Sequence, residues 1–290
     1  DQHWIIGTTD SDWNLDLDHP AASRRDIDYL LGEVNRVLRQ PLGHDDIEGV
    51  YAGLRPLLYG ETDSTSQLSR EHAVSDSASG LISVAGGKYT TYRVMAKDAV
   101  DLAATKLSQR VPESVTHRTV LAGAAGYLGT WNQRDRIAQA HDLPLAHVER
   151  MLGRYGSLID DLLLLMRDRP DLRQPIDGAP GYLRAEALYA ASHEGALHLE
   201  DTLTRRTRIS IETFDRGRRA ARDVAALMGE VLGWDEATVQ RELAHYDKRV
   251  EAERESQAQP DDQTADSARL GAPDVRTGGR NEGADVVRIK

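Results

Sequence analysis

The pattern of apolar and polar residues divides the 290-residue chain into three stretches. In the first, short apolar runs alternate with helical patterns. The runs His3–Thr9, Ile47–Leu54 and Leu81–Ala85 predict strands, and Ser23–Arg39 and Thr90–Leu107 predict helices. The helix at Ser23 starts with a serine and carries an aspartate three residues later, which is the spacing of a capping box. We therefore expect an α/β region over residues 1–110.

Beyond this region the apolar positions follow the helical period, and glycines and prolines separate the segments. The predicted helices are Asn132–His141, Leu145–Tyr155, Leu158–Asp168, Tyr182–His193, Asp215–Leu232 and Asp235–Glu255. From Ser256 the chain is polar and has no aromatic residue, so it buries too little apolar area to offset the entropy of ordering. The sequence predicts an α+β protein: an α/β region at 1–110, an all-α cap domain at 111–255 and a disordered tail at 256–290.

Composition excludes several classes of function. The net charge of -11 argues against broad nucleic-acid binding, which needs a basic surface. Without cysteine there are no disulfides and no thiolate chemistry. The histidine pairs His141/His147 and His193/His198 are six and five residues apart, which is not the i,i+4 spacing of a helical zinc site, so we predict no metal. The strongest apolar run, Leu162–Met166, is far too short to span a bilayer.

The candidate chemistry centres on Gly86-Gly-Lys-Tyr-Thr-Thr-Tyr-Arg93, which follows a predicted strand and opens a helix. A helix N-terminus with a lysine favours an anion or an electron-rich ring. A purely structural interpretation is also open, in which the glycines form a tight turn and Thr90 caps the helix. Two arginines, Arg55 at a strand end and Arg70 in a polar loop, would together with Lys88 suit a phosphate dianion. The sequence alone does not show that the three converge.

Five segments, in the same order and at similar spacing, resemble the flavin-dependent glycerol-3-phosphate dehydrogenases. They are Ile6–Asp10, Gly53–Leu57, Ser69–Glu71, Gly86–Arg93 and Glu200–Arg208. The resemblance covers roughly residues 1–255 and is to the later half of such an enzyme. The Gly-x-Gly-x-x-Gly turn with which the family binds the FAD pyrophosphate does not occur in this chain. We therefore expect this chain to be a portion of such an enzyme that lacks the amino-terminal dinucleotide-binding segment. By itself, this portion is expected to bind FAD weakly.

The resemblance implies oxidation of sn-glycerol 3-phosphate to dihydroxyacetone phosphate, with hydride transfer from C2 to N5 of FAD and a membrane quinone as electron acceptor. By the same resemblance, Arg55 and Lys88 would be catalytic, Arg55, Arg70 and Lys88 would bind substrate, and Thr9, Gly87, Lys88 and Thr90 would contact the flavin. It further implies a cytoplasmic protein, and it leaves open peripheral association with the inner face of the cell membrane and a homodimer.

Two other functions remain open from the sequence. A related flavin-dependent amine or amino-acid oxidase would share the fold, although the set of Arg55, Arg70 and Lys88 favours a phosphate. Alternatively, the helical region is a non-catalytic interaction module. The arginines of Glu200–Arg208 are interpreted as holding the helical domain to the α/β part. Those at 216, 218, 219 and 222 are interpreted as a solvated helix face, with membrane docking as the lesser alternative.

Overall fold

The computed structural model describes residues 3–58, 71–77 and 79–272, and these fall into two compact units. Described residues within Asp1–Thr9, Leu15–Ala52 and Ala122–Lys290 form one, here called the helical unit. Those within Asp10–Asn14 and Gly53–Leu121 form the other, the strand–helix unit. The units differ from the predicted domain bounds, because residues 15–52 group with the helices and not with the strands.

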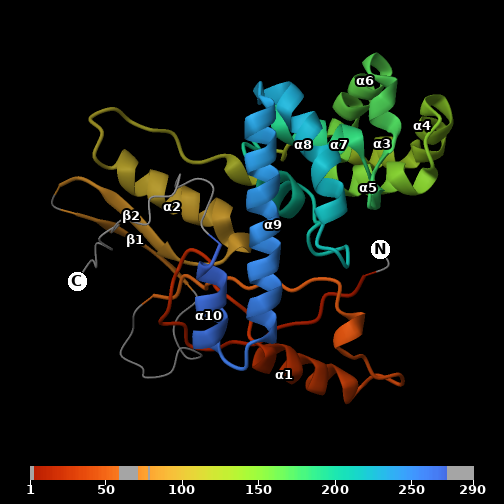
Figure 1. The fold of residues 1–290 in the computed structure, drawn as a ribbon. Coiled ribbons are helices and arrows are strands. Elements are labelled where there is room, and N and C mark those ends of the chain that lie inside the picture. The colour runs from red at the N-terminus through yellow and green to blue at the C-terminus, as the bar shows by residue number, and fades with distance from the viewer. Residues whose placement is uncertain (1–2, 59–70, 78, 273–290) are drawn as a thin grey trace. The chain divides into compact units, whose positions relative to one another are not determined.

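The strand–helix unit is built on one antiparallel strand pair and one helix (Figure 1). Strand β1 (His72–Asp76) pairs with β2 (Ile82–Gly86), with His72 opposite Gly86 and Asp76 opposite Ile82. A 3₁₀ turn at Tyr89–Thr91 leads into α2 (Tyr92–Ala104), which contacts both strands. The predicted strand Leu81–Ala85 and helix Thr90–Leu107 are therefore confirmed.

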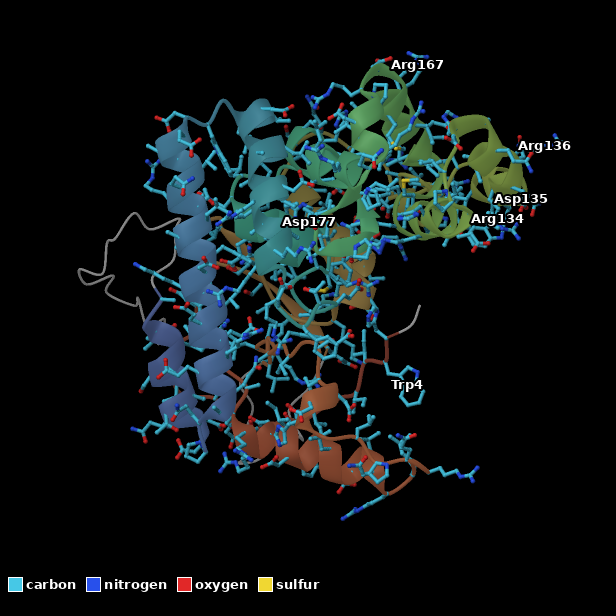
Figure 2. The ribbon with its side chains drawn as sticks, turned by 45° about the vertical axis from the view of Figure 1, so that its right-hand side comes forward. Trp4, Arg134, Asp135, Arg136, Arg167 and Asp177 are labelled. Atoms are coloured by element: carbon cyan, nitrogen blue, oxygen red, sulfur yellow. The ribbon has the colours of Figure 1, made fainter. Side chains whose placement is uncertain are left out.

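The predicted strands His3–Thr9 and Ile47–Leu54 are wrong. Neither segment pairs with another strand in the described part of the chain. A short apolar run does not suffice for a strand, because the backbone N–H and C=O groups also need a neighbouring strand as partner. Apolar side chains of the first segment are also not buried: Trp4 is 73% exposed and Ile5 is 68% exposed, and Trp4 projects from the ribbon (Figure 2).

The helical unit contains most of the helices. They are α1 (Arg24–Asn35), α3 (Tyr127–Asn132), α4 (Arg134–His141), α5 (Leu145–Tyr155), α6 (Ile159–Asp168), α7 (Arg184–Ser192), α8 (Arg218–Leu232), α9 (Glu236–Ala258) and α10 (Asp262–Leu270), with a hairpin of β3 (Pro175–Ile176) and β4 (Ala179–Leu183). Every predicted helix between residues 132 and 255 corresponds to one of α4 to α9. The α+β fold class is confirmed.

The core of the helical unit lies among α5 to α9. Met151 and Leu152 of α5, Leu162 and Met166 of α6, and Leu227 of α8 are almost completely buried. Leu162 and Met166 are four residues apart, so they share one face of their helix. Helix α7 is buried nearly throughout because it packs against both α6 and α8. Helices α8 and α9 also contact each other along this core (Figure 1).

The capping box predicted at the start of α1 is present. The Ser23 N–H donates to the Asp26 carboxylate at 3.0 Å. The Ser23 hydroxyl donates to Asp26 at 2.8 Å and also lies 3.0 Å from the Asp262 carboxylate at the start of α10. The same serine therefore begins one helix and ties it to another that is distant in sequence.

The prediction of a disordered tail from residue 256 is wrong for residues 256–272, and residues 273–290 lie outside the described ones. Helix α9 continues to Ala258 and α10 follows. The Asp261 side chain accepts hydrogen bonds from the Thr264 N–H and hydroxyl, at 2.9 Å each, and Ala265 is fully buried. An N-cap, packing along α9 and an ion pair at 3.5 Å between Arg269 and Glu253 of α9 order this helix, although its average composition is polar.

Two glycines face each other where α5 meets α6. Gly156 has φ +60° and ψ -136°, and a Cβ there would lie 2.1 Å from the carbonyl oxygen of Gly123. The Ser157 N–H donates to that same carbonyl at 2.8 Å. A side chain at 156 would meet rigid backbone, in a conformation that almost only glycine adopts.

We expect Gly156→Ala to lower the free energy of unfolding by about 2 kcal/mol. The matched control is Gly153→Ala, in the same neighbourhood but inside α5 with open space around it. Alanine is the better helix former, so the control should raise stability by about 0.5–1 kcal/mol. Urea unfolding followed by circular dichroism measures both. Equal effects of the two variants would contradict the geometry.

Glu186 is a buried acid at the start of α7, with 1% of its surface exposed. Its carboxylate accepts a hydrogen bond from the Leu183 N–H at 3.0 Å and one from the Tyr155 hydroxyl at 3.3 Å. A guanidinium nitrogen of Arg150 lies 3.7 Å away. Burial raises the pKa of Glu186, against the opposing effect of the Arg150 charge.

A raised pKa in the folded state makes the fold less stable as pH rises above the ordinary glutamate pKa of about 4.3. Glu186→Gln keeps an acceptor for Leu183 and removes the titration. The unfolding free energy of the variant relative to the unmodified chain should therefore increase between about pH 4 and about pH 7. Urea unfolding at both pH values measures this difference. Glu255→Gln makes the same chemical change at an exposed position of α9 and serves as the matched control.

Candidate functional site

The turn between β2 and α2 requires both of its glycines. Gly86 has φ +74°, and a Cβ on it would lie 2.6 Å from the Glu71 carbonyl oxygen and 2.8 Å from Cγ of Leu58. Gly87 has φ +81°, and its Cβ would lie 2.6 Å from Sδ of Met95 on α2. The Gly87 N–H also donates to the Glu71 carbonyl at 3.2 Å. Strand, turn and helix are thus packed too closely for any side chain here.

Lys88 follows these glycines and keeps its ammonium group available. The side chain is exposed, and it forms no hydrogen bond or ion pair with the residues that the structure describes. Its backbone is held instead: the Lys88 N–H lies 3.4 Å from the Thr91 hydroxyl oxygen, and that hydroxyl donates to the Lys88 carbonyl at 3.0 Å. Thr91, and not the predicted Thr90, closes the turn. Thr90 is exposed beside it.

A histidine that the sequence analysis did not single out supports this turn. Nε2 of His72 on β1 lies 2.8 Å from the Asp98 carboxylate on α2, and only 19% of the His72 side chain is exposed. His72 also lies opposite Gly86 in the strand register. The pair joins the strand and the helix that flank the turn. His72 and Asp98 are 26 residues apart in sequence, so no local motif predicts that they pair.

The structure places only some of the predicted site residues together. Gly87, Lys88 and Thr90 share the turn. Arg55 belongs to the same unit, where its Nε lies 3.2 Å from the Asp10 carboxylate, and its side chain is 43% exposed. Leu58, three residues after Arg55, contacts Gly86. Arg70 lies outside the described residues. The convergence of Arg55, Arg70 and Lys88 therefore stays a prediction.

Thr9 is assigned to the helical unit, so its predicted position beside the Gly86–Lys88 turn also stays a prediction. It is half-buried, and its carbonyl accepts a hydrogen bond from the Thr8 hydroxyl at 2.7 Å. No cluster of three or more histidine, aspartate or glutamate side chains arranged for a metal occurs among the described residues. In the same part of the chain, no helix is both long enough and apolar enough to cross a bilayer.

The arginines of Glu200–Arg208 form their observed contacts within the helical unit. Arg205 pairs with Glu200 at 2.8 Å and with Asp201 at 3.1 Å. Nε of Arg206 donates to the Glu194 carbonyl at 2.8 Å. These contacts brace the π-helical turn Asp201–Arg206 and its surroundings. The predicted role in holding two domains together is not among them.

Residues 114–239 match the family model of the C-terminal domain of alpha-glycerophosphate oxidase. This stretch is similar to that domain family. The match begins ahead of α3 and ends within α9, so it contains most of the core of the helical unit. The region that the sequence predicts as an all-α cap therefore resembles the C-terminal domain of alpha-glycerophosphate oxidase.

Longer similarities connect the whole chain with named dehydrogenases. It is 58% identical over 274 residues to glycerol-3-phosphate dehydrogenase 2 of Mycobacterium tuberculosis, which covers 94% of this chain and 47% of the relative. The glycerol-3-phosphate dehydrogenase of Mycobacterium leprae is 57% identical over 275 residues, or 95% of this chain and 47% of that protein. The chain thus spans about half the length of these relatives.

One solved structure gives the same result for the fold. The X-ray structure of the glycerol-3-phosphate dehydrogenase from Bacillus halodurans, complexed with FAD, matches with a TM-score of 0.69 and 28% identity. The match covers 84% of this chain and 48% of that one. The predicted resemblance to a portion of the flavin-dependent glycerol-3-phosphate dehydrogenases, which carries the oxidase-type C-terminal domain, is confirmed.

Proposed function

We propose that this chain is part of an FAD-dependent glycerol-3-phosphate dehydrogenase and supplies residues that contact both substrate and flavin. The observation that carries the proposal is the turn at Gly86–Lys88. It presents an ammonium group that has no partner among the described residues, just ahead of the 3₁₀ turn that leads into α2, in a chain 58% identical to a named glycerol-3-phosphate dehydrogenase. A lysine in these surroundings is suited to stabilise negative charge that develops during a reaction.

The substrate assignment rests on charge. Glycerol 3-phosphate is a dianion joined to a secondary alcohol, and it needs both a phosphate grip and a cation near the C2 oxygen. Lys88 and Arg55 are the catalytic residues in this proposal, and both also bind substrate together with Arg70. Arg55 now pairs with exposed Asp10, and an exposed ion pair is weak enough for a phosphate to replace the carboxylate.

The residues of the turn also fit the edge of a flavin ring. The proposed flavin contacts are Thr9, Gly87, Lys88 and Thr90. Because Gly87 has no side chain, the ring could approach the backbone there. The first N–H groups of a helix lack partners within it, and with Lys88 they favour an electron-rich ring edge. When bound, FAD would accept the hydride that leaves C2 of the alcohol. Lys88 would hold the developing charge on the C2 oxygen as its proton departs.

The remaining assignments follow from the same resemblance. We propose that a membrane quinone is the electron acceptor and that the protein is cytoplasmic. Peripheral association with the inner face of the membrane would bring it to that acceptor, and a homodimer is its proposed assembly. These are properties of the whole enzyme, and this chain spans about half of its relatives.

A flavin reduction assay tests the function. The chain is joined to the remaining part of the Mycobacterium tuberculosis relative, loaded with FAD, desalted and mixed anaerobically with glycerol 3-phosphate. We expect the visible flavin absorbance to bleach with this substrate and not with glycerol or with amino acids. Bleaching by an amino acid alone would replace the proposed substrate with that of an amine or amino-acid oxidase. Retained flavin that no substrate bleaches would refute the dehydrogenase function of the chimera.

A further inference from the structure

A second charged feature lies in the helical unit and contains none of the residues proposed above to bind substrate or flavin. A cavity of about 560 Å³ opens where the β3–β4 hairpin meets the first residues of α7 and α8. Four arginines line this cavity, which is here called the arginine cavity: Arg184, Arg218, Arg219 and Arg222. The only acids lining it are Asp177 and Asp223. A local excess of positive charge is unusual in a chain whose net charge is -11.

Each of the two carboxylates forms an ion pair with one arginine of the cavity. Nη2 of Arg219 lies 2.6 Å from Asp177, and Nη2 of Arg184 lies 3.0 Å from Asp223. This leaves the other two guanidinium groups without a counter-charge inside the cavity. Arg218 reaches outward to α9, where its nitrogens lie 2.8 Å from Asp247 and 2.9 Å from Glu251. These two carboxylates are more than half exposed, so the attraction is screened by water.

Arg222 is the uncommitted residue. It lines the cavity one helical turn after Arg218, and it forms no hydrogen bond or ion pair with any residue that the structure describes. In addition, Nε of Arg184 is buried without a hydrogen-bond partner among those residues. The cavity therefore holds an available guanidinium group whose donors oxygen atoms of an anion would satisfy, and one of its lining arginines carries a buried donor that lacks an acceptor.

Backbone geometry holds one wall of the cavity in place. Gly178, at the tip of the hairpin, has φ +78°, and a Cβ on it would lie 2.7 Å from Cβ of Arg219. The hairpin thus packs directly onto the stem of this arginine and sets Asp177 beside its guanidinium group. A preformed group of donors costs less ordering entropy on binding than free surface side chains do.

We propose that the arginine cavity binds a phosphate group, carried either by a small soluble anion or by a lipid headgroup. Guanidinium groups bind phosphate oxygens in bidentate fashion, and several of them around one cavity match a multiply charged anion. The site uses none of the residues proposed for substrate or flavin. Its existence is thus independent of the proposed dehydrogenase activity.

Titration of the full chain with pyrophosphate, followed by calorimetry at low ionic strength, tests the proposal. Arg222→Gln should weaken binding about tenfold, because one charge-assisted contact is lost. The matched control is Arg136→Gln on α4, which removes the same charge at an exposed position without a described partner, well apart from Asp177 (Figure 2). It should leave binding unchanged. Asp177→Asn should strengthen binding, because it frees Arg219 from its carboxylate.

Vesicles distinguish the two sources of phosphate. If the chain sediments with vesicles that contain phosphatidic acid, and not with phosphatidylcholine vesicles, and Arg222→Gln abolishes this, the phosphate belongs to a lipid. Pyrophosphate binding without vesicle binding assigns the cavity to a soluble anion. Absence of binding to both probes, or equal losses in Arg222→Gln and Arg136→Gln, would overturn the proposal. Thermal melting of each variant shows whether it is folded.

Discussion

Replacing Lys88 with glutamine is expected to lower kcat for glycerol 3-phosphate by about 100-fold in the active flavoprotein that contains this chain. Glutamine retains much of the length and a hydrogen-bond donor but loses the charge. The ammonium of Lys88 has no partner among the described residues, so its removal leaves no unpaired acid and should not disturb the fold. Anaerobic stopped-flow measurement of flavin bleaching separates this step from reoxidation of the flavin by an electron acceptor.

The control for Lys88→Gln is Lys97→Gln, on α2 of the same strand–helix unit. Lys97 pairs with Asp101 one helical turn later, and this pairing raises its pKa. Losing an exposed pair of this kind changes stability little, and we expect flavin reduction to stay within about twofold of the unmodified enzyme. If both lysine variants reduce the flavin at the unmodified rate, Lys88 is not catalytic. If Lys88→Gln raises only KM, the residue binds substrate without stabilising the transition state.

The helices of this protein can be predicted from sequence because the spacing of the apolar residues within each segment indicates which face is buried. Leu145–Tyr155 has the same bounds in the prediction and in α5, where Val148, Met151, Leu152 and Tyr155 form one buried face. These spacings of three and four residues are a local signal that does not depend on the rest of the chain. The glycine turn is predictable for a similar reason, because two adjacent glycines follow a strand and precede a helical pattern.

The features that the sequence did not predict depend on partners far away along the chain. Ile47–Leu54 has the composition of a strand, yet no described strand pairs with it, and a Cβ on Gly49 would lie 2.4 Å from Cα of Ile211. The segment instead packs against a loop about 160 residues later. The ordered helix α10 likewise depends on α9 and on the contact of Asp262 with Ser23. Local periodicity contains no information on any of these partners.

The candidate site divides in the same way. Gly87, Lys88 and Thr90 are adjacent in sequence, so their grouping needed no tertiary information. Arg55 was predicted as a substrate ligand from a motif, and its pairing with Asp10, 45 residues earlier, emerged only from the structure. That contact gives the arginine a partner in the described structure, which a substrate phosphate would have to replace under the proposed function. A binding constant that improves in Asp10→Asn would follow directly from this competition.

The largest loss of stability is expected from Leu162→Ala in α6. Leu162 is completely buried in the core of the helical unit. Its replacement removes buried apolar surface and leaves a cavity among neighbours that are themselves fully packed, such as Met166. The free energy of unfolding should fall by about 3 kcal/mol, within the usual range for buried leucines. Urea unfolding of the full chain, followed by the helical circular dichroism signal, measures the change.

Leu164→Ala makes the same chemical change two residues later, on the opposite face of α6, where the side chain is 47% exposed. Little apolar surface is lost there, and alanine is a slightly better helix former than leucine. The control should therefore stay within about 0.5 kcal/mol of the unmodified chain. Because both variants have the same composition and lie on one helix, only burial distinguishes them. Losses of similar size would mean that α6 does not present its Leu162 face to this core.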